Sequence, residues 1–167
     1  MEKYPRIAVA VSWGKDSVVL LHLARQVKPD IPVFTVITPF KPKETLEFKD
    51  RIVKEWNLNI KEYMSEREPI PGLWETDPDE CCRIFKVEPT KEAVKDLDAW
   101  ISGLRKTEGR TRRDFKEIEK RGNIVKINPL LEWTELVFGG IRLYIMSHRI
   151  RCTRKDTEAS DVLHAPR

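Results

Sequence analysis

One short segment, residues 12–17 (SWGKDS), combines residue types that can hold a phosphate group. Its serine hydroxyls and its lysine can bind oxyanion oxygens, and its glycine carries no Cβ, so backbone amides can approach an anion closely. The run IAVAV before it is typical of a buried parallel strand, and the apolar stretch after it has the length of a helix. We therefore predict that a helix N-terminus, with its dipole and N–H groups, faces the anion. The candidate phosphate-binding residues are Ser12, Trp13, Gly14, Lys15, Asp16 and Ser17.

A plainer alternative for this segment is an ordinary turn that caps a helix, with Asp16 or Ser17 as the N-cap residue. A loop with a single glycine would by itself favour the capped turn. The complete string SWGKDS after a buried strand favours phosphate binding instead. The segment is not a Walker A loop, because the pattern G-x-x-x-x-G-K-[ST] is absent.

The rest of the chain supplies elements that could position such a loop. Apolar runs alternate with apolar helical faces, which predicts an α/β fold of three layers (α/β/α) with a mostly parallel sheet. In an open sheet of this kind, ligands bind at the carboxyl ends of the strands, where residues 12–17 would lie. The predicted strands are residues 7–11, 31–38, 58–63, 98–104 and 123–130, and helices are predicted after residue 17 and over residues 43–56 and 88–97.

Three segments show no clear pattern. Residues 65–79 are rich in Pro, Glu and Asp and are predicted to form a loop. Residues 107–121 are strongly charged and are predicted to be either a mobile loop or an exposed helix. From Val137 onward the sequence has no clear period and no terminating element.

Composition and charge exclude little. The 167 residues include 31 Lys and Arg against 27 Asp and Glu, a net charge of +4. This excess fits a polyanionic small ligand, an acidic protein or nucleic acid, and a solvated charged surface explains it equally well. No apolar run suits a signal peptide or a membrane span, so we expect a cytoplasmic protein with no membrane partner.

The three cysteines are Cys81, Cys82 and Cys152, and their odd number argues against a disulfide scaffold. In a reducing compartment, an adjacent pair such as Cys81 and Cys82 is either a candidate for metal ligation or a buried pair of small apolar side chains. The residues themselves leave both interpretations open.

The phosphate-loop segment resembles a known family. SWGKDS is similar to the S-G-G-K-D-S pyrophosphate loop of the adenine nucleotide α-hydrolase-like (PP-loop) proteins, which include ATP pyrophosphatases and the reductases of adenylyl sulfate and phosphoadenylyl sulfate. Trp13 stands where the family has a second glycine. Its bulky side chain could restrict the loop or stack beside the nucleotide.

Four further segments resemble the reductase branch. ECCRIFKVEP (80–89) is similar to C-C-x-x-x-K-V-E-P, and AWISGLRKTEGRTR (99–112) is similar to W-I-x-G-L-R-R-x-x-x-x-T-R. TPFKPKETLEFKD (38–50) and NPLLEWTE (128–135) resemble two more family segments, although Ile37 replaces an acidic residue. The resemblance implies a nucleotide-binding reductase domain over residues 1–136, followed by a tail over residues 137–167 that forms no independent domain.

The resemblance implies reduction of a sulfuryl group. A cysteine thiolate attacks the sulfate sulfur of adenylyl sulfate or its 3′-phosphorylated form, AMP or adenosine bisphosphate leaves, and a thioredoxin-like dithiol releases sulfite. Cations must hold the charged anhydride. By motif position, the residues that would bind the substrate beside the loop are Thr38, Lys86, Arg105 and Arg112.

In this branch of the family, a Cys-Cys pair and a later C-x-x-C hold a four-iron four-sulfur cluster. Cys81 and Cys82 match the first pair, and thiolates are suitable ligands for iron–sulfur clusters. The chain has no C-x-x-C, so only two of the four ligands are present. The resemblance predicts no flavin or nicotinamide cofactor, and it leaves the oligomeric state and the choice between the two substrates open.

The tail does not continue the resemblance, and the genetic code offers a reason. With the reading frame shifted, codons permitted for residues 150–166 can encode P-L-Y-K-K-G-Y-R-S-L-G-C-A-P-C-T, a family-like string, and residues 137–141 can give V-W-R-Y. We infer a frameshift near Leu136. We accordingly expect a poorly ordered tail, and no catalytic residue is assigned. The tail residues expected to have no function are Cys152, His148, His164 and Asp161.

Three other functions remain open from the residues. An ATP pyrophosphatase-type enzyme that adenylylates a substrate would use the same loop, but would leave the segments at 80–89 and 99–112 unexplained. A nucleic-acid-binding module could use the basic residues 105–121, but Phe115 is the only aromatic there, so we do not expect stacking recognition. A truncated chain could also be a non-catalytic remnant that binds adenine nucleotide without completing the reduction.

The frameshift is tested by reading the DNA across codons 130–167. We expect the shifted frame to be open, to encode C-x-x-C, and to continue past the present last codon toward a terminal cysteine. A shifted frame that closes at once, or that does not encode the family-like string, contradicts the frameshift.

Overall fold

Strand β1 (Ile7–Ala10) lies near the centre of a six-stranded sheet, and its residues alternate between two hydrophobic cores. Ile7 and Val9 face the larger core, and Ala8 and Ala10 face the smaller one. The structure is a computed structural model, and it describes residues 3–108 and 114–148. The alternation confirms the predicted three-layer α/β/α architecture.

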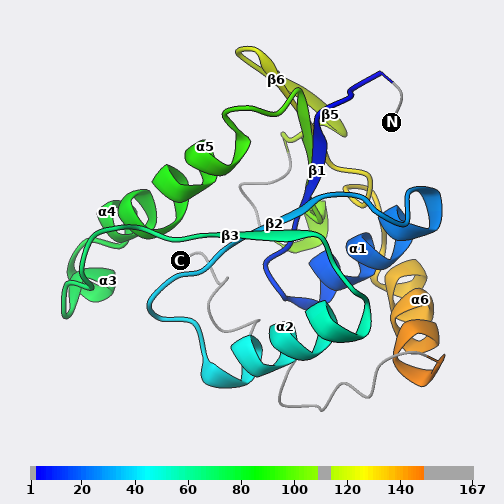
Figure 1. The fold of residues 1–167 in the computed structure, drawn as a ribbon, viewed down its shortest axis with the longest axis horizontal. Helices are drawn as coiled ribbons and strands as arrows, with labels where there is room; N and C mark the ends of the chain where they lie inside the picture. Colours follow the sequence, from blue (N-terminus) through cyan, green and yellow to red (C-terminus); the bar gives the residue numbers. More distant parts are fainter. Residues whose placement is uncertain (1–2, 109–113, 149–167) are drawn as a thin grey trace.

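The strands lie in the order β3-β2-β1-β4-β6-β5, and all neighbours are parallel except β5 and β6. A mostly parallel sheet was predicted from the alternation of strands and helices, and the structure confirms it (Figure 1). Besides β1, the strands are β2 (Val33–Val36), β3 (Ile60–Tyr63), β4 (Ala99–Ile101), β5 (Ile118–Arg121) and β6 (Ile124–Ile127).

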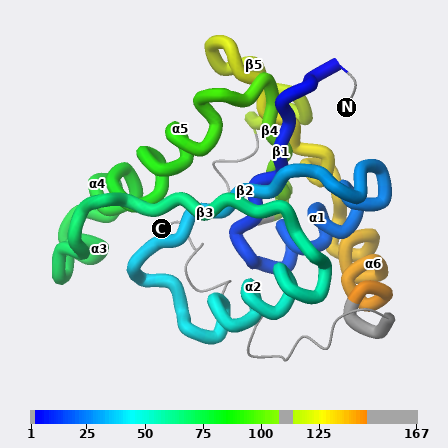
Figure 2. Tube along the Cα trace, in the orientation of Figure 1, coloured from blue at the N-terminus to red at the C-terminus, as the bar shows by residue number. Residues whose placement is uncertain are grey.

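Three helices cover the larger core. They are α1 (Lys15–Val27), α2 (Lys43–Glu55) and α6 (Glu135–His148), and they lie on one side of the sheet in Figures 1 and 2. The smaller core is covered by α5 (Glu88–Val94), whose Ala93 packs against Ala8 and Phe34. Helices on both faces explain why the central strands read as continuous apolar runs.

One long helical stretch was only partly predicted. Residues 65–79 were expected to be a loop, but they include α3 (Leu73–Thr76) and the first residues of α4 (Pro78–Cys82). From α4 the chain continues through η1 (Arg83–Val87) into α5, so the helix predicted at residue 88 begins ten residues earlier. Asp77 caps its start by accepting a hydrogen bond from the Glu80 amide at 3.0 Å. The Pro-, Glu- and Asp-rich composition predicted a loop here, although a proline such as Pro78 is compatible with the first position of a helix.

The charged segment 107–121 was predicted to be a mobile loop or an exposed helix, and both alternatives are wrong for its last residues, which form a strand. Residues 118–121 form β5, which pairs with β6 through a tight turn in which Gly122 has φ +62°. Only the turn η2 (Lys106–Glu108) is helical in the described part. A charged, exposed edge strand has no apolar alternation to reveal it, and its charges protect the sheet edge from aggregation.

The expectation of a poorly ordered tail is wrong for its first residues. Phe138, Ile141 and Ile145 recur at helical spacing and face the larger core, where Phe138 and Ile145 are buried. These contacts place α6 beside α1. Residues 149–167, with Cys152, Asp161 and His164, lie outside the described residues, and of His148 only the backbone is described. Within residues 3–108 and 114–148, no helix has the length and apolarity that crossing a bilayer requires.

Candidate nucleotide-binding site

The phosphate-loop segment Ser12–Ser17 joins the carboxyl end of β1 to α1, as predicted. Sheet order reverses here: the chain proceeds from β1 to β2 and β3 on one side, then returns to β4 on the other. Figure 2 shows β1 between β2 and β4. In open α/β sheets this switch point is where a crevice for ligands forms. The segments after β2 and β4 therefore flank the loop.

The Trp13 side chain anchors the loop to the larger hydrophobic core. The φ of Trp13, 69°, lies in the left-handed region, which is rare for a bulky residue and costs about 1–3 kcal/mol. Its side chain is only 1% exposed, and the ring Nε1 donates a hydrogen bond to Thr35 Oγ1 of β2 at 2.9 Å. The ring is thus part of the core and cannot stack on a bound nucleotide. Of the two alternatives for this residue, the structure supports restriction of the loop.

The start of α1 has no side-chain cap among the described residues. The helix begins after Gly14. The Ser17 hydroxyl instead donates to the Gly14 carbonyl at 2.9 Å and lies 3.3 Å from the Ser12 hydroxyl. The capped-turn alternative is therefore wrong for Ser17 and Asp16. An uncapped helix N-terminus with two neighbouring hydroxyls suits a phosphate group.

The segment after β4 braces the loop through a buried ion pair. Arg105 has 0% exposure, and its Nε donates to Asp16 Oδ1 at 2.8 Å. Its Nη1 lies 2.8 Å from Glu135 at the start of α6, and its guanidinium stacks over the Phe138 ring at 4.3 Å. Although burial lowers the pKa of Arg105, the charges of Asp16 and Glu135 raise it on balance. Arg105 therefore stays charged and fixes Asp16.

Gly103 allows this segment to approach the loop. A Cβ at Gly103 would lie 3.1 Å from the backbone of Asp16 and from Ser17 Cα, and backbone atoms cannot move aside. The neighbouring Ser102 donates to the buried Asn128 at 2.6 Å, which ties β4 to the end of β6. The loop thus rests on a rigid part of the sheet.

The segment after β2 reaches the loop from the other side. Lys41 Nζ donates to the Ser12 carbonyl at 2.9 Å. Burial, and secondarily the charge of Lys86, lower the pKa of Lys41 to about 8. Thr38 begins the same turn and accepts a hydrogen bond from the Lys41 amide at 3.1 Å. Sequence reasoning missed Lys41. The one available signal was its place in the turn after the strand next to β1.

Lys86 and the cysteine pair lie on the helical stretch that flanks this turn. Cys81 is buried with Ile84 and Phe85, whereas Cys82 is exposed. Burial, together with the neighbouring Cys82, raises the pKa of the Cys81 thiol. Within the described residues, no group of three or more Cys, His, Asp or Glu side chains could hold a metal ion. The pair alone does not provide the four thiolates of a four-iron cluster.

The structure thus brings most of the predicted residues together. The loop residues and Arg105 are in contact, Thr38 lies in the adjoining turn, and Lys86 is close enough to affect the pKa of Lys41. Lys86 itself is exposed on η1. Arg112 lies outside the described residues. That Arg105 also contacts substrate stays a prediction, because its guanidinium is occupied by Asp16 and Glu135.

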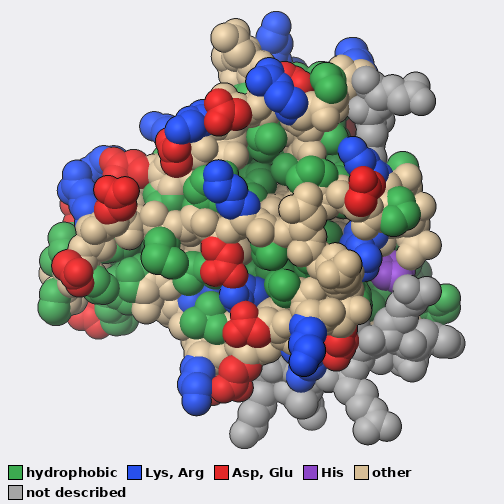
Figure 3. All heavy atoms as spheres, viewed as in Figure 1, with side chains coloured by type: hydrophobic (Ala, Val, Ile, Leu, Met, Phe, Trp, Pro, Cys, Tyr) green, Lys and Arg blue, Asp and Glu red, His purple; other side chains and the backbone are tan. Residues whose placement is uncertain are grey.

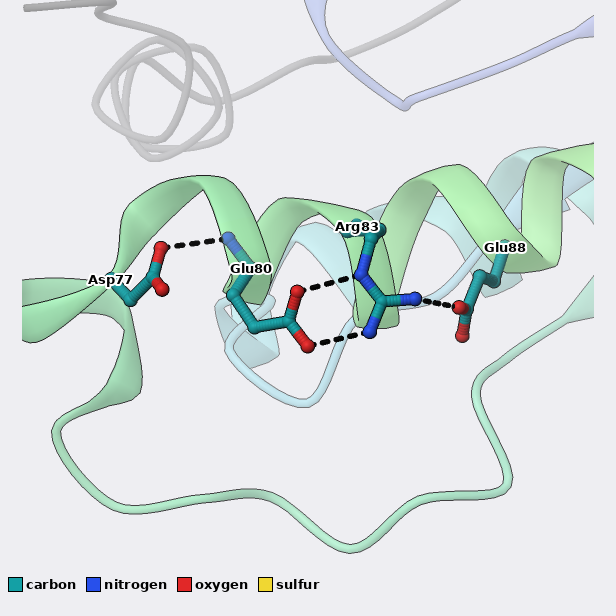
Figure 4. Close-up of polar contacts among 4 residues, drawn as sticks. All are labelled: Asp77, Glu80, Arg83 and Glu88. Carbon is teal, nitrogen blue, oxygen red and sulfur yellow. Dashed lines mark hydrogen bonds and ion pairs between the residues drawn. The ribbon is translucent and has the colours of Figure 1, made fainter.

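We expect Arg105→Met to lower the free energy of unfolding by about 3–5 kcal/mol, because it leaves the Asp16 carboxylate buried without its cation. Urea denaturation followed by circular dichroism measures this loss. Arg83→Met is the control. Arg83 bonds Glu80 and Glu88 on the helical surface (Figure 4), and its side chain is 46% exposed, so its loss should matter far less. Equal losses in the two variants would contradict the bracing role.

The unequal burial of the cysteine pair predicts unequal reactivity. In the native protein, iodoacetamide should alkylate Cys82 several times faster than Cys81, because Cys82 is exposed and the pKa of Cys81 is raised. Peptide mass spectrometry of briefly labelled protein gives the two rates. In urea the two rates should converge. Equal rates in the native protein would contradict the burial of Cys81 and the exposure of Cys82.

Comparison with known proteins identifies the family of this chain. The sequence model of the phosphoadenosine phosphosulfate reductase domain matches residues 6–154. The chain is 34% identical over 141 residues to a phosphoadenosine 5′-phosphosulfate reductase of Synechocystis, covering 77% of this chain and 57% of that protein. It is 33% identical over 155 residues to an adenosine 5′-phosphosulfate reductase of Halalkalibacterium halodurans, covering 87% and 66%. The chain therefore spans somewhat more than half the length of these relatives.

Solved structures show the same fold. A phosphoadenylyl-sulfate reductase from Candida auris, in a phosphate complex, superposes with a TM-score of 0.72 at 22% identity, covering 87% of this chain and 74% of that one. An FMN adenylyltransferase from Candida glabrata gives a TM-score of 0.61 at 18% identity, covering 83% and 48%. With the family match over most of its length and a loop built at the sheet's switch point, the chain belongs to the phosphoadenosine phosphosulfate reductase domain family.

Proposed function

We propose that this chain binds adenylyl sulfate, or its 3′-phosphorylated form, as the nucleotide-binding part of a thiol-dependent reductase that yields sulfite. The observation that carries the proposal is the uncapped start of α1, held between Lys41 on one side and the Arg105–Asp16 pair on the other. Relatives named as reductases of these two nucleotides support the choice of substrate.

The proposed chemistry needs an anion site first. The anhydride between phosphate and sulfate carries spread negative charge, which backbone amides and ammonium groups stabilise. A thiolate would attack the sulfate sulfur, the sulfur–oxygen bond to the nucleotide would break, and AMP or adenosine bisphosphate would leave. A thioredoxin-like dithiol would then release sulfite and become a disulfide. The residues described here would hold and orient the nucleotide, and none of them is assigned as the attacking thiolate.

A four-iron cluster remains a proposal for the family's full-length form. Cys81 and Cys82 would supply two of its ligands, and the described residues supply no further pair. We derive no step of the reaction through a cluster.

Two other functions are less well supported. An ATP pyrophosphatase-type enzyme fits the fold shared with FMN adenylyltransferase, but it gives no role to Cys81 and Cys82 of α4. Nucleic-acid binding would favour a continuous basic surface, whereas the face in Figure 3 shows basic and acidic side chains interspersed.

The proposal predicts a ranking of ligands in isothermal titration calorimetry. Adenylyl sulfate should bind more tightly than AMP, and adenosine should bind weakly, because the loop recognises the anionic part. Lys15→Met should weaken adenylyl sulfate binding by about tenfold, the cost of one charge-assisted hydrogen bond. Lys43→Met is the matched control, since Lys43 lies on the surface of α2 beside Glu47.

Two results would contradict this function. Tighter binding of ATP with Mg²⁺, accompanied by release of pyrophosphate, would favour the adenylylating enzyme. Equal affinity for adenylyl sulfate and adenosine would show that the loop does not recognise an anion.

A further inference from the structure

The turn at residues 38–42 connects the phosphate loop to the cysteine-bearing helix. On one side, Lys41 Nζ donates to the Ser12 carbonyl at 2.9 Å. On the other, the Phe40 ring meets the Phe85 ring edge-on, with centroids 5.6 Å apart, in a cluster that includes Cys81. The turn is therefore held on both sides, by the packing of Phe40 and by the hydrogen bond of Lys41.

Lys41 carries a charge that the protein does not neutralise. It is half-buried, and within residues 3–108 and 114–148 no carboxylate forms an ion pair with it. The charged group that affects its pKa is Lys86 of η1, which disfavours the ammonium form. The acidic group of the phosphate loop, Asp16, is paired with Arg105, and Glu44 of α2 is exposed. Two lysines that influence each other in this way, one of them hydrogen-bonded to the phosphate loop, favour an anion as their neighbour.

The hydrogen-bonding capacity of Lys41 is also incomplete. An ammonium group has three N–H donors, and one of them is used by the Ser12 carbonyl. That carbonyl belongs to the first residue of the phosphate loop, so the remaining donors lie beside the loop. Because Lys41 is half-buried, these donors are accessible to a ligand that binds beside the loop.

We propose that Lys41 is an anion-binding residue of this site, which gives one N–H to the Ser12 carbonyl and another to an oxygen of the anhydride held by the loop. This inference deepens the proposed function and rests on the same loop. Lys41 both positions the loop and contacts its ligand, from the same turn as the predicted substrate-binding residue Thr38.

Affinity for two probes tests the contact. Adenylyl sulfate and inorganic pyrophosphate are titrated into the wild-type chain, Lys41→Met and Lys43→Met. Lys43 lies in the same region on the exposed surface of α2, so its variant removes the same charge without touching the loop. We expect Lys41→Met to weaken both probes by about tenfold and Lys43→Met to leave both nearly unchanged. Unchanged affinity in Lys41→Met, with its fold checked by circular dichroism, overturns the proposal.

Proton uptake separates a direct contact from a purely structural role. Adenylyl sulfate has no group that titrates near pH 8, whereas Lys41 does. Binding beside Lys41 should raise the pKa of its ammonium group, so the wild-type chain should take up a fraction of a proton at pH 8, measured by calorimetry in buffers of different ionisation enthalpy. Lys43→Met should keep this uptake. Lys41→Arg should bind without it, because arginine stays charged, and it replaces Lys41→Met if that variant does not fold.

The outcomes distinguish the two proposals. If pyrophosphate binding depends on Lys41 but adenylyl sulfate does not bind, the anion site stands and the proposed function fails. If adenylyl sulfate binds with no proton uptake and no dependence on Lys41, the function stands and this inference fails. If the wild-type chain binds neither probe, both are overturned.

Discussion

The buried ion pair between Arg105 and Asp16 is the contact on which the site depends. It joins residues 89 positions apart, from the segments after β4 and β1, at the point where the strand order reverses. Taking both charges out of water is costly, and the pair is tolerable because Glu135 and the Phe138 ring also contact the guanidinium. The same contact holds the start of α1 in one place, so an anion can meet a preformed site instead of ordering a loop.

The loop combines this bracing with local strain. Trp13 has a backbone conformation that glycine would adopt without cost, and its buried ring and hydrogen bond to Thr35 offset the strain. Three contacts hold the resulting loop. The Trp13 ring packs in the hydrophobic core, Arg105 binds Asp16 on the β4 side, and Lys41 binds the Ser12 carbonyl on the β2 side. Such a loop is suited to bind an anion with little loss of conformational entropy.

The sequence was sufficient for the parts of the site that are contiguous. The strand–loop–helix arrangement around residues 12–17 and the alternation of strands and helices follow from short-range patterns, and the structure agrees with both. The sequence was insufficient where contacts between residues far apart in the chain determine the position of a side chain. Nothing local shows that Arg105 would turn toward Asp16, or that Lys41 would reach Ser12 from the turn after β2. The edge strand β5 was missed because its residues are charged on an exposed edge. Helix α6 was missed because further apolar residues on its exposed face obscure the apolar stripe; they are Leu136, Val137, Leu143 and Tyr144.

The contact of α6 with Arg105 has a consequence for anyone who builds chimeras from this chain. Glu135 and Phe138, which both contact the guanidinium, lie at the start of α6. A fusion joint placed before residue 135 would separate the loop from two of the groups that hold its brace. A joint placed in α6 after Phe138 would keep both and let the donor region begin on a helix that already packs against α1.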